Sequence, residues 1–393
     1  MSHDVSPARG TNILPPLPDD PAYKELTKAE SIVRRIQLGI VGGIYQPGSR
    51  LPMRSEIESA ADASWVTIQR AFDRLKANGD VRSVKGQGTF VTDRPPCLFR
   101  YGVIFPARPP EKPSLYIEAV QQAAEELTRR GPVEFRLYRQ AYDYLTGEAT
   151  GEAYAELEKD VQNLSLAGLI FARHPSPVSD HSFYTQTALP RFAFSTDPPG
   201  FPAVGGIDMG GTRDMVEKGL RYLAGQGKHR VGALVPGARF GNENRRHLME
   251  ATAEAGMEIR RYWVQSPHVE EPDWTANSAE LLMRLPPEDR PNGLLIMDDH
   301  LVCPAAKGLR AAGVRVPEDV TVLAHCNFPR VTCPDLPFIR LGYDLREALA
   351  KAVAWLRKRA ARAEIPARSK LPARFEADLL DPGDIADALR VNR

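Results

Sequence analysis

The chain of 393 residues has few cysteines, no long apolar run and almost no net charge. Its four cysteines, at positions 97, 303, 326 and 333, include no Cys-x-x-Cys pair, so we expect no disulfide framework and reduced, buried thiols. No apolar stretch is long enough to cross a membrane, and the N-terminus lacks the apolar core of a signal peptide. We therefore expect a cytoplasmic protein with no membrane partner.

Patterns typical of metal binding and catalysis are missing as well. His300, Cys303, His325 and Cys326 are conceivable zinc ligands, but their spacings match no standard zinc site. Asp298-Asp299-His300 is the densest titratable run, yet no nucleophile elbow, phosphate loop or Schiff-base lysine motif accompanies it. Paired carboxylates at a helix start also favour the helix dipole without any chemistry. We expect no metal, no cofactor and no enzymatic activity.

Charge is unevenly distributed along the chain, although it sums to only +1. Residues 24–95 hold twelve Lys or Arg against eight Asp or Glu, and this basic surplus favours contacts with phosphates. Residues 1–22 are rich in Pro, Asp and Ser and offer little to bury. This composition predicts a disordered N-terminal arm.

Residues 23–93 have the pattern of a small helical domain that ends in a hairpin. Apolar side chains at helical spacing from 26 to 40 predict one helix, and Pro52 can begin a second. Ser64 is placed to N-cap a third helix, whose apolar face carries Ile68, Ala71, Phe72 and Leu75. Residues 81–91 predict two strands joined by a Gly-rich basic tip. A helix with one polar face and a hairpin behind it suits the major groove and the adjacent backbone.

The stretch from Gly48 to Val91 resembles the winged helix-turn-helix of the GntR family of bacterial transcription regulators. The resemblance rests on residues 40–48 leading into Leu51-Pro52, and on the ending Gly86-Gln87-Gly88-Thr89-Phe90-Val91. It implies double-stranded operator DNA as a partner. The implied DNA contacts are Arg54, Ser55, Ser64, Trp65, Thr67, Gln69, Arg70, Lys85, Gly86 and Gln87.

The chain departs from the family pattern at several positions, beginning with Met53-Arg54-Ser55, where the family usually has Ser-Glu-Arg after the Leu-Pro. Trp65 stands where an Arg follows the capping Ser, and Gln69 stands where a second Arg is common. Because those arginines would reach guanine edges, the operator sequence of typical members should not apply here. Gln69 could read adenine. Trp65 could pack on a sugar or a thymine methyl, or it could seal the joint between the two helices.

The pattern changes after the Pro-Pro pair in the linker, residues 94–98. Between residues 99 and 375, short apolar runs alternate with amphipathic stretches, which predicts parallel sheets with helices on both faces. Strands are expected at 101–105, 133–137, 166–171, 191–194, 203–207, 231–235, 293–297, 320–324 and 338–341. This region is longer than a single hydrophobic core usually accommodates, so we expect it to form two lobes. A C-terminal tail is expected at residues 376–393.

The order of landmarks in this region resembles the effector domain of LacI/GalR repressors, which is similar to periplasmic sugar-binding proteins. The resemblance rests on residues 167–170, on residues 219–232 and, above all, on residues 313–322 with the sequence GVRVPEDVTV. It implies an α/β fold class, in which a winged helix-turn-helix domain precedes a two-lobed periplasmic-binding-protein-like domain of doubly wound parallel sheets. This is the layout of arabinose-repressor-type regulators and implies a homodimer.

Ligands of such sheets bind outside the carboxyl ends of the strands. The expected effector contacts are Arg173, Asp197, Asn244, Arg245, Trp274, Asp299 and Asn327. The pocket Arg of the family falls on Asn244, and the family's Gly-Phe-Asp-Asp segment has become residues 324–327. Either the effector differs from that of a typical member or the site is degenerate. We predict a ligand-responsive transcription regulator, a repressor, with a small carbohydrate-related effector. The alternative is a ligand-independent DNA-binding regulator whose sensor fold serves only dimerisation.

Overall fold

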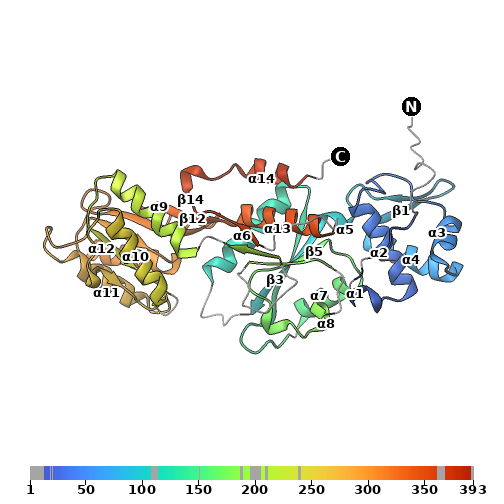
Figure 1. The fold of residues 1–393 in the computed structure, drawn as a ribbon, viewed down its shortest axis with the longest axis horizontal. Helices are drawn as coiled ribbons and strands as arrows, with labels where there is room; N and C mark the ends of the chain where they lie inside the picture. Colours follow the sequence, from blue (N-terminus) through green and yellow to red (C-terminus); the bar gives the residue numbers. More distant parts are fainter. Residues whose placement is uncertain are drawn as a thin grey trace.

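The computed structural model describes residues 13–17, 19, 21–107, 114–149, 151–185, 189–194, 205–208, 211–237, 240–360 and 368–390. They form an elongated molecule, with a small helical head at one end and two α/β lobes in a row behind it (Figure 1). The first lobe lies between the head and the second lobe. Among these residues, no helix is long and apolar enough to cross a membrane.

The head consists of four helices and one antiparallel hairpin. Its elements are α1 (Pro21–Lys24), α2 (Lys28–Val41), α3 (Arg54–Ala61), α4 (Trp65–Asn78), β1 (Val81–Val84) and β2 (Gly88–Val91). As predicted, the Ser64 side chain caps α4 by accepting a hydrogen bond from the Thr67 backbone. Gly79 ends α4 in the left-handed conformation, with φ 82°, which favours glycine. The predicted helices and hairpin are confirmed.

The beginning of the chain differs from the prediction. Leu14 is fully buried in the core of the head. Arg35 holds this segment through hydrogen bonds to the carbonyl oxygens of Leu14 and Pro15, at 2.8 and 2.9 Å. The prediction of a disordered arm over residues 1–22 is therefore wrong around Leu14, because one leucine among prolines and aspartates still supplies a core contact. Residues 1–12 lie outside the described residues.

The predicted linker, residues 94–98, is a packed connection. Most of it forms a short helix, α5 (Pro96–Phe99), and both Cys97 and Leu98 lie in the core of the head. The same core includes Leu164, which belongs to the first lobe. The head and the first lobe therefore share buried side chains.

The first lobe contains a six-stranded sheet in the order β13-β7-β6-β5-β3-β4, and every neighbouring pair is parallel. Its strands are β3 (Arg100–Ala107), β4 (Glu134–Asp143), β5 (Gly168–Phe171), β6 (Arg191–Ala193), β7 (Gly205–Asp208) and β13 (Arg368–Lys370). Its helices are α6 (Leu115–Arg130), α7 (Glu152–Gln162), α8 (Ser182–Thr185), α13 (Leu345–Ala360) and the 3-10 helix η1 (Ser176–Val178). The short apolar runs predicted as strands are confirmed in this lobe.

The second lobe contains a sheet in the order β14-β12-β11-β10-β8-β9, in which only the edge pair β12–β14 is antiparallel. Its strands are β8 (Val231–Leu234), β9 (Val264–Gln265), β10 (Gly293–Ile296), β11 (Thr321–Phe328), β12 (Ile339–Asp344) and β14 (Arg374–Phe375). Its helices are α9 (Gly211–Gly225), α10 (Asn242–Glu254), α11 (Pro272–Met283), α12 (Val302–Ala311), η3 (Arg261–Trp263) and η4 (Asp299–Leu301).

The C-terminal tail returns to the first lobe. It forms η5 (Glu376–Asp378) and α14 (Pro382–Ala388), and Ile385 and Ala386 are buried. The Arg357 guanidinium on α13 donates a hydrogen bond of 2.7 Å to the Leu389 carbonyl. The tail therefore packs on its own chain.

The cysteines depart from the prediction of reduced thiols. Cys303 and Cys333 form a disulfide with a Cα–Cα separation of 5.9 Å, whereas Cys97 and Cys326 are free and buried. The prediction failed because the two cysteines, one on α12 and one in the loop after β11, are thirty positions apart, and no local spacing reveals such a pair. The disulfide also removes Cys303 from the conceivable zinc ligands.

Candidate DNA-binding face and candidate effector site

Helix α4 presents its first two turns to solvent. Trp65 is 59% exposed and Val66 is 52% exposed, and Arg70 also lies on this face. The opposite face carries the buried side chains Ile68, Ala71, Phe72 and Leu75. Trp65 does not seal the joint between the helices, so that alternative is wrong. A large aromatic side chain instead stands on the surface that is expected to face DNA.

A chain of polar contacts fixes the side chains at the centre of this face. The Arg54 guanidinium, at the start of α3, donates to the Gln69 side-chain oxygen and lies 5.1 Å from the centre of the Phe72 ring. The Gln69 amide nitrogen donates to both carboxylate oxygens of Asp73, at 2.8 and 2.9 Å. Because both ends of the Gln69 amide are engaged, its orientation is set before any base approaches.

The hairpin stands beside these helices as a wing. Its tip residues Lys85, Gly86 and Gln87 are exposed. A groove of about 340 Å³ separates the wing from the start of α3; it is lined by Arg50, Leu51, Pro52, Met53, Arg54, Ser83, Val84, Gly86, Gly88 and Thr89. Arg50 was absent from the predicted contacts, although a basic residue just before Leu51-Pro52 was a readable signal. The groove places two guanidinium groups between the helix and the wing.

The remaining predicted DNA contacts lie on the same side of the head. Ser55 is exposed in the first turn of α3. The Ser64 and Thr67 hydroxyl oxygens are 3.0 Å apart at the start of α4. These residues therefore lie at the N-terminal ends of α3 and α4, where backbone N–H groups also favour phosphate.

The other end of α4 contacts the first lobe. The Asn78 amide donates 2.6 Å to the Asn163 carbonyl, and Arg74 donates to the Gln162 carbonyl while forming an ion pair of 3.0 Å with Glu30. In Figure 1, α3 lies on the side of the head away from the lobes, and α2 lies nearer to them. The exposed turns that are predicted to face DNA and the turns that contact the first lobe are therefore opposite ends of one helix.

A buried polar network completes this junction between the head and the first lobe. The Gln37 amide donates to the Asp80 carboxylate at 2.9 Å and to the Leu164 carbonyl at 2.6 Å. Asp80 also accepts a bond of 3.1 Å from the Cys97 backbone N–H. Burial raises the pKa of Asp80, although these hydrogen bonds act in the opposite direction. The network joins the head, α5 and the first lobe. Its buried polar groups have one another as hydrogen-bond partners in place of water.

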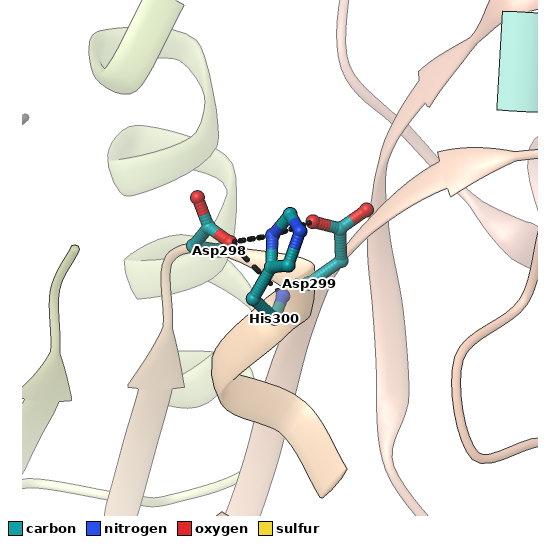
Figure 2. Close-up of side chains that lie close together, drawn as sticks. All are labelled: Asp298, Asp299 and His300. Carbon is teal, nitrogen blue, oxygen red and sulfur yellow. Dashed lines mark hydrogen bonds and ion pairs between the residues drawn. The ribbon is translucent and has the colours of Figure 1, made fainter. Parts of the chain in front are cut away.

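In the second lobe, the predicted effector residues centre on the end of β10. The His300 ring lies between two carboxylates (Figure 2): its Nδ1 atom is 2.9 Å from an Asp298 oxygen and 3.3 Å from an Asp299 oxygen. Burial alone would lower the pKa of His300, but hydrogen bonds to both carboxylates and their charges raise it to about 10. His300 is therefore protonated at neutral pH.

Asp299 is further connected to the neighbouring strand. The Asn327 amide of β11 donates 2.8 Å to the Asp299 carboxylate, and both side chains are buried. Burial would raise the pKa of Asp299, but the hydrogen bond from His300, the charge of His325 and the Asn327 bond lower it to about 2. The structure thus brings together two predicted effector residues, Asp299 and Asn327. It adds His300, which was not among the predicted contacts although its position next to Asp299 in the sequence could have indicated it.

Strand β11 is longer than predicted. Residues 325–327 were expected beyond the strand end, but β11 runs to Phe328, and Asn327 pairs with Tyr343 in the parallel ladder. Asn327 is accommodated inside this buried strand because the Asp299 carboxylate accepts its hydrogen bond.

The other predicted effector contacts of the second lobe are more dispersed. Asn244 and Arg245 lie in the first turn of α10, and the Arg245 guanidinium donates 2.8 Å to the Ser266 hydroxyl beyond β9. Trp274, predicted as a stacking wall, is 64% exposed near the start of α11. These residues follow the carboxyl ends of β8 and β9, as expected for this sheet.

The first lobe contributes Arg173, which follows β5. Its guanidinium lies 4.7 Å from the centre of the Tyr144 ring, and the Tyr116 hydroxyl donates 3.1 Å to the adjacent Ala172 carbonyl. No local pattern singles out these two tyrosines as parts of a site. Asp197 lies outside the described residues, so its predicted role stays a prediction.

One ion pair connects the loop after β11 to the first lobe. The Arg330 Nε atom is 2.7 Å from a carboxylate oxygen of Glu118, which lies on α6. Neither residue belonged to the predicted site, because a contact across 212 positions leaves no local signal. The carboxyl end of β11 therefore faces the first lobe.

Comparison with known protein families gives two matches. Residues 28–91 match the bacterial regulatory proteins of the gntR family. Residues 220–376 match the periplasmic binding protein-like domain. Both resemblances read from the sequence are thereby confirmed.

Curated relatives match over the N-terminal part of the chain. The HTH-type transcriptional regulator YdeF of Bacillus subtilis (strain 168) is 28% identical over 109 residues, which cover 25% of this chain and 23% of that protein. The HTH-type transcriptional repressor YtrA of the same organism is 27% identical over 64 residues, which cover 16% of this chain and 49% of that protein. The chain thus spans between about a quarter and a half of the length of these relatives.

Solved structures match over the two lobes. A LacI-family regulatory protein from Chloroflexus aggregans superimposes with a TM-score of 0.54 at 16% identity, covering 70% of this chain and 96% of that chain. A LacI-family regulator from Arthrobacter sp. FB24, in complex with lactose, gives a TM-score of 0.51 at 19% identity, covering 70% of this chain and 97% of that chain. At these identities the likeness establishes the fold. The chain therefore joins a winged helix-turn-helix domain of the gntR family of bacterial regulatory proteins to a periplasmic binding protein-like domain with the LacI-type fold.

Proposed function

We propose that this transcription regulator is a cytoplasmic, ligand-responsive repressor. In this proposal a homodimer presents two winged heads to a pseudo-palindromic operator, because a two-fold DNA site requires two copies of the reading helix. A small molecule bound at the strand ends of the sensor lobes changes the affinity of the heads. The size of that change equals the difference in ligand affinity between the two sensor states.

The exposure of the first turns of α4 carries the DNA-binding part of the proposal. Trp65, Gln69 and Arg70 are accessible, and Gly86 of the wing lines the same groove as Arg54, which bonds to Gln69. Docking on the first lobe involves the opposite end of the helix, at Arg74 and Asn78. The sensor therefore leaves the reading face uncovered.

The chemistry at the end of β10 supports a polar effector. At neutral pH, Asp299 is ionised and His300 is protonated, so hydrogen-bond acceptors and donors lie side by side. Carboxylates and amides next to a charged donor suit a molecule with several hydroxyl groups. Arg173 stacked on Tyr144 adds a cation in the first lobe. We infer a carbohydrate-related effector, consistent with the lactose bound to the Arthrobacter relative.

A second candidate function is a ligand-independent regulator whose lobes serve only dimerisation. The observation in its favour is that Asp299, His300 and Asn327 already satisfy one another through hydrogen bonds. A polar cluster of this kind could hold the lobe together with no ligand. In neither case does the cluster require an enzymatic role, and we propose none.

Footprinting tests the DNA-binding proposal. We expect the purified protein to protect a two-fold-symmetric site near its own gene, with an affinity that falls steeply between 50 and 200 mM salt, roughly as expected for several phosphate contacts. Arg70→Ala should weaken binding to every sequence, whereas Gln69→Ala should reduce the preference for the operator over random DNA. A salt-independent affinity, or equal losses for both variants on operator and random DNA, would contradict the assignment.

Thermal denaturation tests the effector proposal. At a concentration of about one hundred times Kd, a ligand adds about 2.7 kcal/mol of stability, which corresponds to a rise in Tm of roughly 5 to 10 °C for a domain of this size. We expect one or more compounds from a panel of sugars, sugar acids and nucleosides to produce this rise in the wild type. Asn327→Ala should abolish it, and Asn277→Ala, at an exposed position on α11, should retain it. A panel that leaves Tm unchanged supports the ligand-independent alternative.

A further inference from the structure

The disulfide connects two functional parts of the second lobe. Cys303 is the second residue of α12 and directly follows the turn that carries Asp298, Asp299 and His300. Cys333 lies in the loop between β11 and β12, residues 329–338, which we call the bridging loop. The disulfide therefore ties the candidate effector turn to this loop.

The bridging loop also carries the ion pair to the first lobe. Arg330 belongs to the loop and pairs with Glu118 on α6 at 2.7 Å. On the other side, Arg340 of β12 donates to the Cys333 and Pro334 carbonyls at 3.1 and 2.8 Å. The covalent bond to Cys303 thus restrains the bridging loop, which carries the Arg330–Glu118 ion pair to the first lobe.

The two bonded cysteines differ from the two free ones in accessibility. Cys303 and Cys333 are half-buried, whereas Cys97 and Cys326 are buried. A small thiol in solution can reach the first pair more readily than the second. When reduced, Cys303 lies near the N-terminus of a ten-residue helix. This position stabilises a thiolate and favours Cys303 as a leaving group and as an attacking thiol.

We propose that Cys303 and Cys333 form a reversible thiol–disulfide site that controls the bridging loop. Attack by a dithiol forms a mixed disulfide and releases one cysteine thiolate; the second thiol of the reductant then releases the other. Overall, the protein disulfide gains two electrons and two protons, and the dithiol becomes a disulfide. A small-molecule disulfide reverses the reaction. The reduced form loses the tether, so the bridging loop and the Arg330–Glu118 ion pair become more mobile.

The proposed cytoplasmic location favours a reversible disulfide over a permanent one. Disulfides in the cytosol are usually transient, catalytic or redox-sensing, since the thiol pool reduces the others. This step rests on the cytoplasmic location proposed above. The loop geometry does not depend on it, and the experiment below uses purified full-length protein without DNA or effector, so its result is separable from the proposed function.

Cysteine alkylation followed by mass spectrometry tests the disulfide itself. After treatment with a small-molecule disulfide, alkylation under denaturing, non-reducing conditions should modify Cys97 and Cys326 alone, and prior treatment with dithiothreitol should make all four cysteines reactive. Re-oxidation should restore the first pattern. Four reactive cysteines after the oxidising treatment would overturn the proposal.

Hydrogen exchange tests control of the loop. Reduction should accelerate exchange of residues 329–338 about tenfold, as expected when a local opening becomes easier by about 1.4 kcal/mol, while β8 keeps its protection. Cys303→Ser/Cys333→Ser should exchange like the reduced protein under all conditions. Arg330→Gln, which removes the ion pair but retains the disulfide, should accelerate exchange around Glu118 and keep the redox response of the loop. Unchanged exchange on reduction, or equal loss of protection throughout the second lobe, would show a purely structural disulfide.

Discussion

Arg54→Ala is expected to lower the affinity for operator DNA by about tenfold to a hundredfold, the loss typical of one arginine that contacts bases. The Arg54 guanidinium lies over the Phe72 ring, bonds to Gln69 and lines the groove beside the wing. Gln69 replaces the arginine that is common in the family, and Arg54 is a guanidinium that bonds directly to the side chain at this position. Titration of labelled operator at constant salt measures the effect.

A charge-matched control separates base reading from a general electrostatic effect. Arg284→Ala removes one exposed positive charge from the second lobe, where Arg284 forms an ion pair with Glu280 and donates a hydrogen bond of 3.4 Å to the Ala311 carbonyl. We expect this variant to bind operator like the wild type. For Arg54→Ala, the loss on operator should exceed the loss on random DNA. Similar affinities of both variants for the operator would show that Arg54 takes no part in recognition.

The head was largely predictable because its signals are local. The Ser64 cap, the apolar spacing of α4 and the Gly79 stop each act within one or two helical turns. Whether Trp65 is buried or exposed was not predictable, since the alternative depends on how closely α3 approaches α4. The burial of Leu14 was missed for a related reason: its partners include Arg35, on a helix that begins fourteen residues later.

The sheets were predicted from apolar runs, and the failures occur where polar residues lie in buried strands. The apolar pattern of β11 is interrupted at residues 325–327. The strand predicted from that pattern therefore ends at residue 324, whereas β11 continues to Phe328. Asn327 is tolerated there because Asp299 accepts its hydrogen bond across the sheet. This partner lies in η4, beyond the end of a neighbouring strand, so the local sequence pattern around Asn327 does not reveal it.

Individual residues of the candidate effector site were predictable from the ends of the expected strands, but the contacts between them were not. Asp299 and Asn327 were selected separately, and the parallel sheet places them in contact. In contrast, the Arg330–Glu118 ion pair and the Cys303–Cys333 disulfide depend on how the lobes and loops approach one another. Such contacts are set by the tertiary fold, and no residue spacing encodes them.

Gly308→Ala should destabilise the second lobe by about 2 to 3 kcal/mol, because overpacking of a tight contact typically costs that much. Gly308 lies inside α12 at the crossing with α11, where a Cβ atom would overlap the Ala276 carbonyl oxygen and lie 2.9 Å from the Ala279 Cβ atom. Relieving that overlap would push α12 away from α11 and shift the turn that carries Asp299. Urea denaturation measures the change as a lower midpoint at constant slope.

Gly225→Ala, the same substitution at another helical position, is expected to have no destabilising effect. Gly225 is the last residue of α9, and a Cβ atom there would meet nothing within 4 Å. Alanine generally stabilises a helical position relative to glycine by up to about 1 kcal/mol, so this variant should be neutral or slightly more stable. The contrast in sign separates packing from helix propensity. If Gly308→Ala were as stable as Gly225→Ala, the close crossing of α11 and α12 would not exist in solution, and the position of Asp299 would have to be fixed by other contacts.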